Sequence, residues 1–326
     1  MDTARRKCLN GLVEASALDA DNQVSNLAFF KTHKTGSTTL ATILHRYGRR
    51  HDLQVAHFPG YGSTIPIAEA AKKTRESQNR LDIMHYHIDT NTSKQERWAQ
   101  AKARYGDVMR DPDNINFITL FREPRDRLLS FYTFFLQSET RVPIEEFFLQ
   151  AKPDPEVVEQ LRNLGCKELG VDTEADLDEL IRTEIPQFKL IVLVERFDEG
   201  LMVLRNLLGW HLVDMTYISV NQTSKRGRKG AFKHRTPFDT LPKDVQDKID
   251  ELTVLDRRLY DAGAAAFEKK RAPIAVEVEA DLDEFEKLQI ILKAILRHRL
   301  PSDPVFDLYR YKTADYYENP PPMANF

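Results

Sequence analysis

Near its beginning the chain reads Leu27-Ala-Phe-Phe-Lys31-Thr-His-Lys-Thr-Gly36-Ser-Thr-Thr-Leu40, in which a short apolar run gives way to a basic, hydroxyl-rich turn. Beyond the turn, apolar residues recur with helical spacing, at Leu40, Ile43, Leu44 and Tyr47. This spacing predicts an amphipathic helix packed against a sheet. The turn then lies at a helix N-terminus, where unpaired N–H groups and the helix dipole favour an anion. We interpret the stretch as a phosphate cradle.

The side chains of this turn strengthen the interpretation. Lys31 and Lys34 add positive charge, and Gly36 lets the backbone approach a ligand closely. Further hydrogen-bond donors come from the hydroxyl groups of Thr35, Ser37, Thr38 and Thr39. The nucleoside-triphosphate pattern G-x-x-x-x-G-K-[ST] is not matched, because Lys31 replaces its first glycine and the lysine precedes Gly36. ATP or GTP with magnesium is therefore disfavoured.

A second basic turn follows another apolar run, in Asn116-Phe-Ile-Thr-Leu-Phe-Arg122-Glu-Pro-Arg-Asp-Arg-Leu-Leu-Ser130-Phe-Tyr132. The apolar run predicts a strand, Pro124 suits a turn or the first position of a helix, and apolar residues then recur with helical spacing. Arg122 is expected to leave the strand at the same sheet edge as the first turn, with Ser130 about two helical turns further on. The alternative interpretation is a solvated charged turn made by Arg122, Arg125 and Arg127.

Together the two turns resemble the donor-binding motifs of sulfotransferases, which use 3′-phosphoadenosine 5′-phosphosulfate. The run Lys31-Thr-His-Lys-Thr-Gly-Ser37 is similar to the K-T-H-K-T-G-S signature of the galactose 3-O-sulfotransferase family, which includes the galactosylceramide (cerebroside) sulfotransferases. Weaker similarity extends from about residue 26 to about residue 270, including Leu190–Trp210 and Leu255–Tyr260. The resemblance implies a P-loop-like α/β fold with a central, mostly parallel sheet flanked by helices.

The resemblance also implies roles for individual residues. Sulfuryl transfer to a hydroxyl needs a base, cations that neutralise the donor, and in-line positioning. His33 is our candidate for the base because histidine ordinarily titrates near neutral pH, and Lys34 is the candidate for stabilising the bridging oxygen. The alternative is that His33 has a structural role only and makes a hydrogen bond to the loop backbone. The resemblance implies that the following residues bind the sulfuryl donor: Lys31, Lys34, Thr35, Gly36, Ser37, Thr38, Arg122, Ser130 and Arg228.

Acceptor recognition is assigned to the segment that follows a third apolar run. His87 and Asn91 match the outer residues of the family's H-x-x-F-N region, but Thr90 replaces its phenylalanine. We expect His87 and Asp89 to contact the acceptor, with His85 or His87 as the second candidate for the base. The alternative is that both histidines are polar residues at a strand end whose hydrogen bonds are already satisfied.

The densest basic run is 225–235, in which Arg228-Lys-Gly230 resembles the R-K-G that helps to hold the 3′-phosphate in cytosolic sulfotransferases. A solvated basic loop, or a surface for an acidic acceptor, explains the same residues.

Composition limits the remaining classes. The 326 residues are 41% hydrophobic with a net charge of −3, which suits a large α/β domain and argues against bulk binding of nucleic acid. Cys8 and Cys166 are the only cysteines, and the nine histidines form no ligand motif, so neither a disulfide framework nor a metal is expected. No run of the sequence approaches the ~20 apolar residues of a membrane span.

Alternation of apolar and helical segments predicts a doubly wound parallel sheet. Its strands are expected at about 26–30, 82–86, 116–121 and 190–195. We divide the chain into a leader (1–25), a catalytic domain (26–272) and an amphipathic helix with a Pro-rich tail (273–326). Residues 152–186 read as acidic helices to which no chemistry is assigned.

The expected function is sulfuryl transfer from 3′-phosphoadenosine 5′-phosphosulfate, without a metal, to the 3-hydroxyl of galactose on a glycolipid or glycan. Two alternatives stay open: another acceptor, such as a glycosaminoglycan uronic acid, and a catalytically silent nucleotide-binding module. By resemblance the protein is expected in the Golgi; if the chain is complete, the cytoplasm is expected instead. The sequence indicates no oligomeric state.

Overall fold

The structure is a computed structural model that describes residues 23–58, 64–88, 98–218 and 236–297. Its centre is a four-stranded, all-parallel sheet with the strand order β3-β1-β5-β6. The strands are β1 (Leu27–Phe30), β3 (Ile83–Met84), β5 (Asn116–Phe121) and β6 (Leu190–Leu193). All four expected strands are confirmed, although β3 and β6 are shorter than predicted. The register pairs Leu27 with Asn116 and Ile118 with Leu190.

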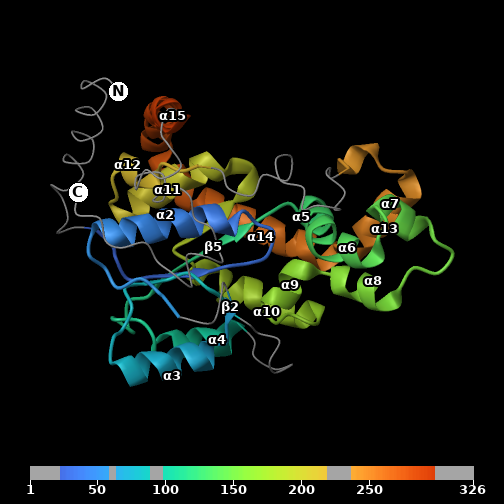
Figure 1. Cartoon of the computed structure of the whole chain (residues 1–326), viewed down its shortest axis with the longest axis horizontal. Coiled ribbons are helices and arrows are strands. Elements are labelled where there is room, and N and C mark those ends of the chain that lie inside the picture. Colours follow the sequence, from blue (N-terminus) through green and yellow to red (C-terminus); the bar gives the residue numbers. More distant parts are fainter. Residues whose placement is uncertain (1–22, 59–63, 89–97, 219–235, 298–326) are drawn as a thin grey trace.

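Helices cover both faces of this sheet (Figure 1). On β6, Val192 packs against Gly200 of α11 (Phe197–Leu208), while its neighbour Ile191 packs against Gly263 of α14 (Val254–Arg271). Because successive side chains of a strand point to opposite faces, α11 and α14 lie on opposite sides. This confirms the doubly wound α/β architecture. The central strands are accordingly apolar and buried on both faces, and only Thr119 of β5 interrupts the apolar run of its buried residues.

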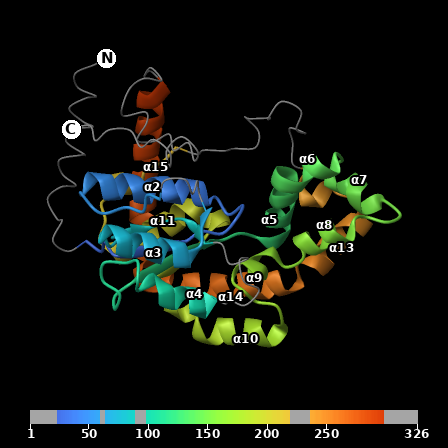
Figure 2. The same cartoon turned by 60° about the horizontal axis from the view of Figure 1, so that its bottom comes forward.

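The other helices around the sheet extend this main core. On the α11 side lie α2 (Ser37–Arg50), α12 (Leu212–Met215) and α15 (Ala275–Arg297) (Figure 2). Below them in Figure 1 lie α3 (Ile67–Ser77) and α4 (Trp98–Tyr105), with α10 (Glu174–Thr183) nearby. A parallel pair of β2 (Thr64–Ile65) and β4 (His87–Ile88) flanks the sheet. Short 3₁₀ turns lie at η3 (Ile185–Gln187), η4 (Val194–Arg196), η5 (Phe238–Thr240) and η6 (Ala272–Ile274).

A second hydrophobic core lies beside the first and was not expected from the sequence. We call this group of helices the helical lobe; Figures 1 and 2 show it to one side of the sheet. Its core includes Leu128, Tyr132, Phe147 and Ile249 and is separate from the sheet core. The lobe consists of α5 (Pro124–Phe131), the π-helix η2 (Tyr132–Leu136), α6 (Gln137–Thr140), α7 (Ile144–Leu149), α8 (Pro155–Leu161) and α13 (Lys243–Leu252).

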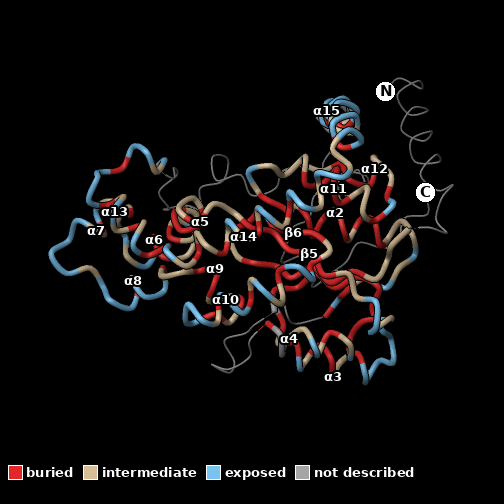
Figure 3. The backbone as a smooth tube through the Cα atoms, turned by 180° about the vertical axis from the view of Figure 1, so that it is seen from behind, coloured by how far each residue is buried: buried red, intermediate tan, exposed pale blue. Residues whose placement is uncertain are grey.

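The amphipathic helix expected near the end of the chain is α15. Its Val278 and Phe285 are fully buried in the main core, whereas Val276 and Ile290 are exposed. Figure 3 shows that much of α15 is exposed. The division at residue 272 stays a prediction, as do the leader and the tail, most of which lie outside the described residues. Within the described ranges, no helix combines the length and apolar character that crossing a membrane requires.

Candidate active site

The turn after β1 lies at the carboxyl edge of the sheet, where α/β proteins bind ligands. α2 begins at Ser37, and Gly36 before it adopts a left-handed conformation (φ 71°) that suits glycine. No side chain caps the start of α2. Lys34 is also left-handed (φ 62°), which costs an L-residue about 1–2 kcal/mol. Such strain concentrates at ligand-binding and catalytic sites.

Two buried threonines hold the turn in shape. The Thr35 hydroxyl donates to the carbonyl oxygen of Thr32 over 3.0 Å. The Thr32 hydroxyl donates to the carbonyl oxygen of Leu120 on β5, also over 3.0 Å. Thr35 was predicted to bind the sulfuryl donor. In the structure its hydroxyl proton is already engaged in a hydrogen bond within the turn. The hydroxyl groups of Ser37 and Thr38 lie on the first turn of α2, and their binding role stays a prediction.

Lys31 presents a charge that the described residues do not satisfy. Its side chain is only 3% exposed, and its Nζ has no hydrogen-bond partner among them. Burial lowers the pKa of this ammonium to about 7. Since a buried, unpaired charge is costly, Lys31 is suited to an anion that enters the cradle.

Lys34 reaches over the edge of the helical lobe. Its Nζ lies 3.6 Å from the centroid of the Phe134 ring. Burial, together with the nearby Arg122 guanidinium, lowers the pKa of Lys34 to about 8. Lys31, Lys34 and Arg122 thus bring three basic side chains to this edge of the sheet.

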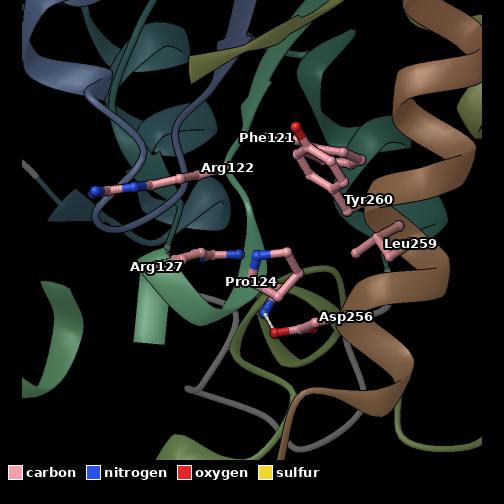
Figure 4. Close-up of a pocket in the computed structure, with 8 residues that line it drawn as sticks. Phe121, Arg122, Pro124, Arg127, Asp256, Leu259 and Tyr260 are labelled. Atoms are coloured by element: carbon pink, nitrogen blue, oxygen red, sulfur yellow. Dashed lines mark hydrogen bonds between the residues drawn. The ribbon is translucent and has the colours of Figure 1, made fainter. Parts of the chain in front are cut away.

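Arg122 leaves the end of β5 and reaches toward the first turn, as predicted (Figure 4). Its Nη1 donates to the carbonyl oxygen of Lys34 over 3.0 Å, so the two basic turns are in direct contact. Ser130 lies near the end of α5 and is half-buried. Its role as a ligand of the 3′-phosphate stays a prediction.

The other two arginines of the second turn do not form a solvated charged turn. Arg125 makes a bidentate pair with Asp250 of α13, at 2.6 and 3.0 Å, which ties α5 to the rest of the helical lobe. Arg127 is only 6% exposed and contacts the first turn, because its Nε donates to the carbonyl oxygen of His33 over 3.0 Å.

His33 is held by a carboxylate that sequence analysis did not find. Glu168 ends α9 (Leu164–Glu168), and its Oε1 lies 2.6 Å from Nδ1 of His33. The backbone N–H of His33 donates to both oxygens of Glu168 over 3.1 Å. On the other side, Nη2 of Arg127 donates to Oε2 of Glu168 over 2.6 Å. Burial opposes the charge of Glu168, but Arg127 and His33 outweigh it and hold its pKa below the usual value.

This arrangement fixes the orientation of the imidazole ring. With Nδ1 donating its proton to Glu168, Nε2 of the neutral ring is free to accept a proton. The His33 side chain is 38% exposed, whereas that of Glu168 is 22% exposed. The ring is thus accessible and firmly positioned, as a general base requires.

A further buried carboxylate supports Glu168 and Arg127 from behind. Asp256 of α14 accepts hydrogen bonds from the backbone N–H groups of Gly165 and Cys166, at 3.0 and 2.9 Å (Figure 4). A Cβ at Gly165 would come within 2.7 Å of Nη1 of Arg127, so a larger residue there would require the guanidinium to shift. Burial raises the pKa of Asp256 despite the nearby Arg127. Arg127, Gly165 and Asp256 line a small pocket beside the end of β5, together with Phe121 and Arg122.

His87 packs directly on the candidate base. The two imidazole rings stack with centroids 4.2 Å apart, and Nδ1 of His87 donates to the carbonyl oxygen of Lys31 over 3.2 Å. Burial, then the neighbouring Lys31 and His33, keep the pKa of His87 well below its usual value. His85 is fully buried, and burial, followed by Lys31, lowers its pKa to about 3. Both are neutral, and the accessible ring is that of His33.

Two predicted site residues cannot be placed. Asp89 and Arg228 lie outside the described residues, as does the whole basic run 225–235. Within the described part of the chain, no three His, Cys, Asp or Glu side chains are grouped to hold a metal ion.

A parallel sheet with a basic turn at a helix N-terminus after β1, and an arginine after the neighbouring β5, is an arrangement with which α/β proteins bind phosphorylated ligands. Comparison with known proteins gives the family. The sequence model of galactose-3-O-sulfotransferases matches residues 8–280, so the chain belongs to the galactose-3-O-sulfotransferase family. The resemblance noted in the sequence is confirmed, and the family is one of sulfotransferase enzymes.

Individual relatives are more distant. Galactose-3-O-sulfotransferase 3 of Mus musculus is 29% identical over 302 residues, which are 86% of this chain and 64% of the relative. Galactosylceramide sulfotransferase of Mus musculus is 27% identical over 262 residues, 75% of this chain and 57% of the relative. Galactose-3-O-sulfotransferase 2 of Homo sapiens is 27% identical over 261 residues, 73% of this chain and 59% of the relative. The chain thus spans between 57% and 64% of the length of these relatives.

Proposed function

We propose that the protein transfers a sulfuryl group from 3′-phosphoadenosine 5′-phosphosulfate to a carbohydrate hydroxyl, the 3-hydroxyl of galactose on a glycan or glycolipid. The observation that carries this proposal is the pairing, in one turn, of a buried unsatisfied cation with an oriented imidazole. Lys31 lacks a counter-ion among the described residues, and His33 is fixed by Glu168. Family membership supports the sulfotransferase reaction, and the names of the relatives support galactose as the acceptor.

The residues present fit an anionic donor. Lys31, Lys34 and the N–H groups of the first turn of α2 would hold its 5′-phosphosulfate, and Arg122 would hold its 3′-phosphate, with Ser130 proposed beside it. When bound, the donor supplies the sulfuryl group and a phosphate leaving group. Lys34 belongs to the same turn, two residues before Gly36, and would neutralise the charge that develops on the bridging oxygen.

The chain itself supplies the base. Nε2 of His33 accepts the proton of the acceptor hydroxyl while Nδ1–H stays bonded to Glu168. Arg127 keeps Glu168 ionised, so this carboxylate orients the ring and stabilises the imidazolium that forms. His87 supports one face of the ring by stacking and takes no proton in this scheme. Its expected contact with the acceptor, and that of Asp89, stay part of the proposal.

The test is transfer of labelled sulfuryl from the donor to methyl β-galactopyranoside, with the product analysed for the position of sulfation. We expect sulfation at the 3-hydroxyl, and activity that persists in the presence of a chelator because lysines meet the donor's charge. If only a uronic acid is sulfated, the proposed acceptor is wrong and the reaction class stands. If no hydroxyl compound is sulfated, the protein is a catalytically silent nucleotide-binding module. Golgi localisation, expected from the family, is a separate prediction.

A further inference from the structure

One aromatic side chain beside the candidate base is exposed without an evident structural reason. Phe134 is 57% exposed, and no other phenylalanine in the described ranges is classed as exposed. Leaving a phenylalanine in water forgoes the free energy of its burial. Phe134 lies on η2, and single π-helical turns inside helices are frequent at functional sites.

Phe134 contacts Lys34 of the donor cradle on one side and Phe135, a neighbour of the candidate base, on the other. One face of its ring is covered by Nζ of Lys34 at 3.6 Å. Its neighbour Phe135 contacts the edge of the Phe134 ring at 4.7 Å and lies 5.8 Å from the His33 ring. Phe131 packs on Phe135 at 4.8 Å and anchors the group in the helical lobe.

The accessible side of His33 is therefore bordered by an aromatic wall. Glu168 occupies the Nδ1 side of the ring and His87 covers one face, with a centroid separation of 4.2 Å. Phe135 lies 5.8 Å from the His33 ring and Phe134 packs on Phe135, so Phe134 is one side chain removed from the candidate base. An aromatic face carries negative charge density and attracts the polarised C–H bonds on the apolar face of a pyranose ring.

We propose that Phe134 is a specificity-determining residue that stacks on the pyranose ring of the acceptor and presents its hydroxyl to His33. This inference rests on the proposed function and names the contact that selects a sugar ring. The contact of Lys34 with the same aromatic side chain links the donor cradle to the acceptor platform. Phe135 supports the platform from the side of the lobe.

The experiment measures KM for methyl β-galactopyranoside and for galactitol, an acyclic comparator whose hydroxyl groups at C2, C3 and C4 have the same configuration. Phe134→Ala is expected to raise KM for the galactoside about three- to tenfold, the range of one aromatic contact, and to change galactitol less. Phe134→Trp should retain the low KM. Leu149→Ala, which alters an exposed apolar side chain at the end of α7 in the same lobe, is the matched control and should leave KM unchanged.

Affinity for adenosine 3′,5′-bisphosphate is measured on each variant as an independent readout of folding and donor binding. An unchanged galactoside KM in Phe134→Ala, an equal rise for galactitol, or a loss of bisphosphate affinity in place of the KM effect would overturn the platform. Failure of the unaltered enzyme to sulfate any galactoside would instead overturn the proposed function. The two failures are thus distinguishable.

Discussion

The sheet edge and the helical lobe contribute to the site in different ways. At the sheet edge, consecutive residues of one turn build the cradle, and the Thr35 hydroxyl stabilises it from within the turn by a hydrogen bond to the carbonyl oxygen of Thr32. In the lobe and its junction with the sheet, the functional contacts join distant segments: Glu168 and His33 are 135 residues apart. The cradle itself is local in sequence, although Arg122 joins it from 88 residues away, whereas the half that orients the base is assembled by tertiary packing.

His33 stands where the two regions meet, and its replacement should have the largest effect. His33→Ala is expected to lower kcat by about 10²–10⁴, the usual range for loss of a general base, with little change in bisphosphate affinity. Steady-state kinetics and calorimetry measure the two quantities. His87→Ala is the paired control, and an inactive His87→Ala beside a His33→Ala enzyme with near-normal kcat would transfer the base to His87.

Lys31 tests the sheet edge alone. Lys31→Met is expected to weaken bisphosphate binding about 10–100-fold, the value of one charge-assisted hydrogen bond. Because it also removes a buried ammonium that has no hydrogen-bond partner among the described residues, it should raise the free energy of unfolding of the donor-free protein by about 1–3 kcal/mol. Thermal and chemical unfolding measure this gain. Lys243→Met, at an exposed lysine of α13, should change neither quantity.

The pKa values of the two cradle lysines predict how binding of the donor depends on pH. The donor-free pKa values of Lys31 and Lys34 are about 7 and about 8, and an anion favours their charged forms. Bisphosphate affinity should therefore fall as pH rises through this range, and binding should take up protons. Calorimetry in buffers of different ionisation enthalpy detects the uptake. An affinity that is constant from neutral pH to about pH 9 would contradict the assignment.

Stability of the donor-free protein should follow the opposite trend in this range. In the unfolded chain Lys31 stays protonated up to the ordinary lysine pKa of 10.5, whereas the folded side chain loses its proton near pH 7. The unfolded state then binds more protons, so this group makes the free energy of unfolding rise with pH between these values. Lys31→Met should remove that contribution, which unfolding experiments across this pH range measure.

The difference between the sheet edge and the helical lobe also explains which features could be predicted from the sequence. Buried strands followed by basic turns have a local pattern, so the parallel sheet and the position of Arg122 at the same sheet edge as the first turn were predicted, whereas its hydrogen bond to Lys34 was not. Glu168 gave no such signal, because an acidic residue in an amphipathic helix resembles any solvated position. In the sequence Arg127 is one of three charges of a turn, and only the fold shows it buried against Glu168.

Phe134 illustrates the same limit from the acceptor side. In the sequence, Phe131 and Phe135 belong to the apolar face that helical spacing predicts, and Phe134 lies off that face. Helical periodicity contains no sign of the π-helical turn or of the contact between Phe134 and Lys34. A histidine followed by a lysine in a cradle motif was therefore easier to assign than the residues that hold or border them.

The most direct test of the division between the two regions is a titration of the unaltered protein, Arg122→Ala and Glu168→Gln with adenosine 3′,5′-bisphosphate and adenosine 5′-phosphate. We predict that the unaltered protein and Glu168→Gln prefer the bisphosphate to the same extent, although Glu168→Gln turns over more slowly, and that Arg122→Ala loses this preference, at a cost of about 2–4 kcal/mol. Equal affinity of the unaltered protein for both nucleotides, or equal weakening in both variants, would contradict a donor site built by the sheet edge alone.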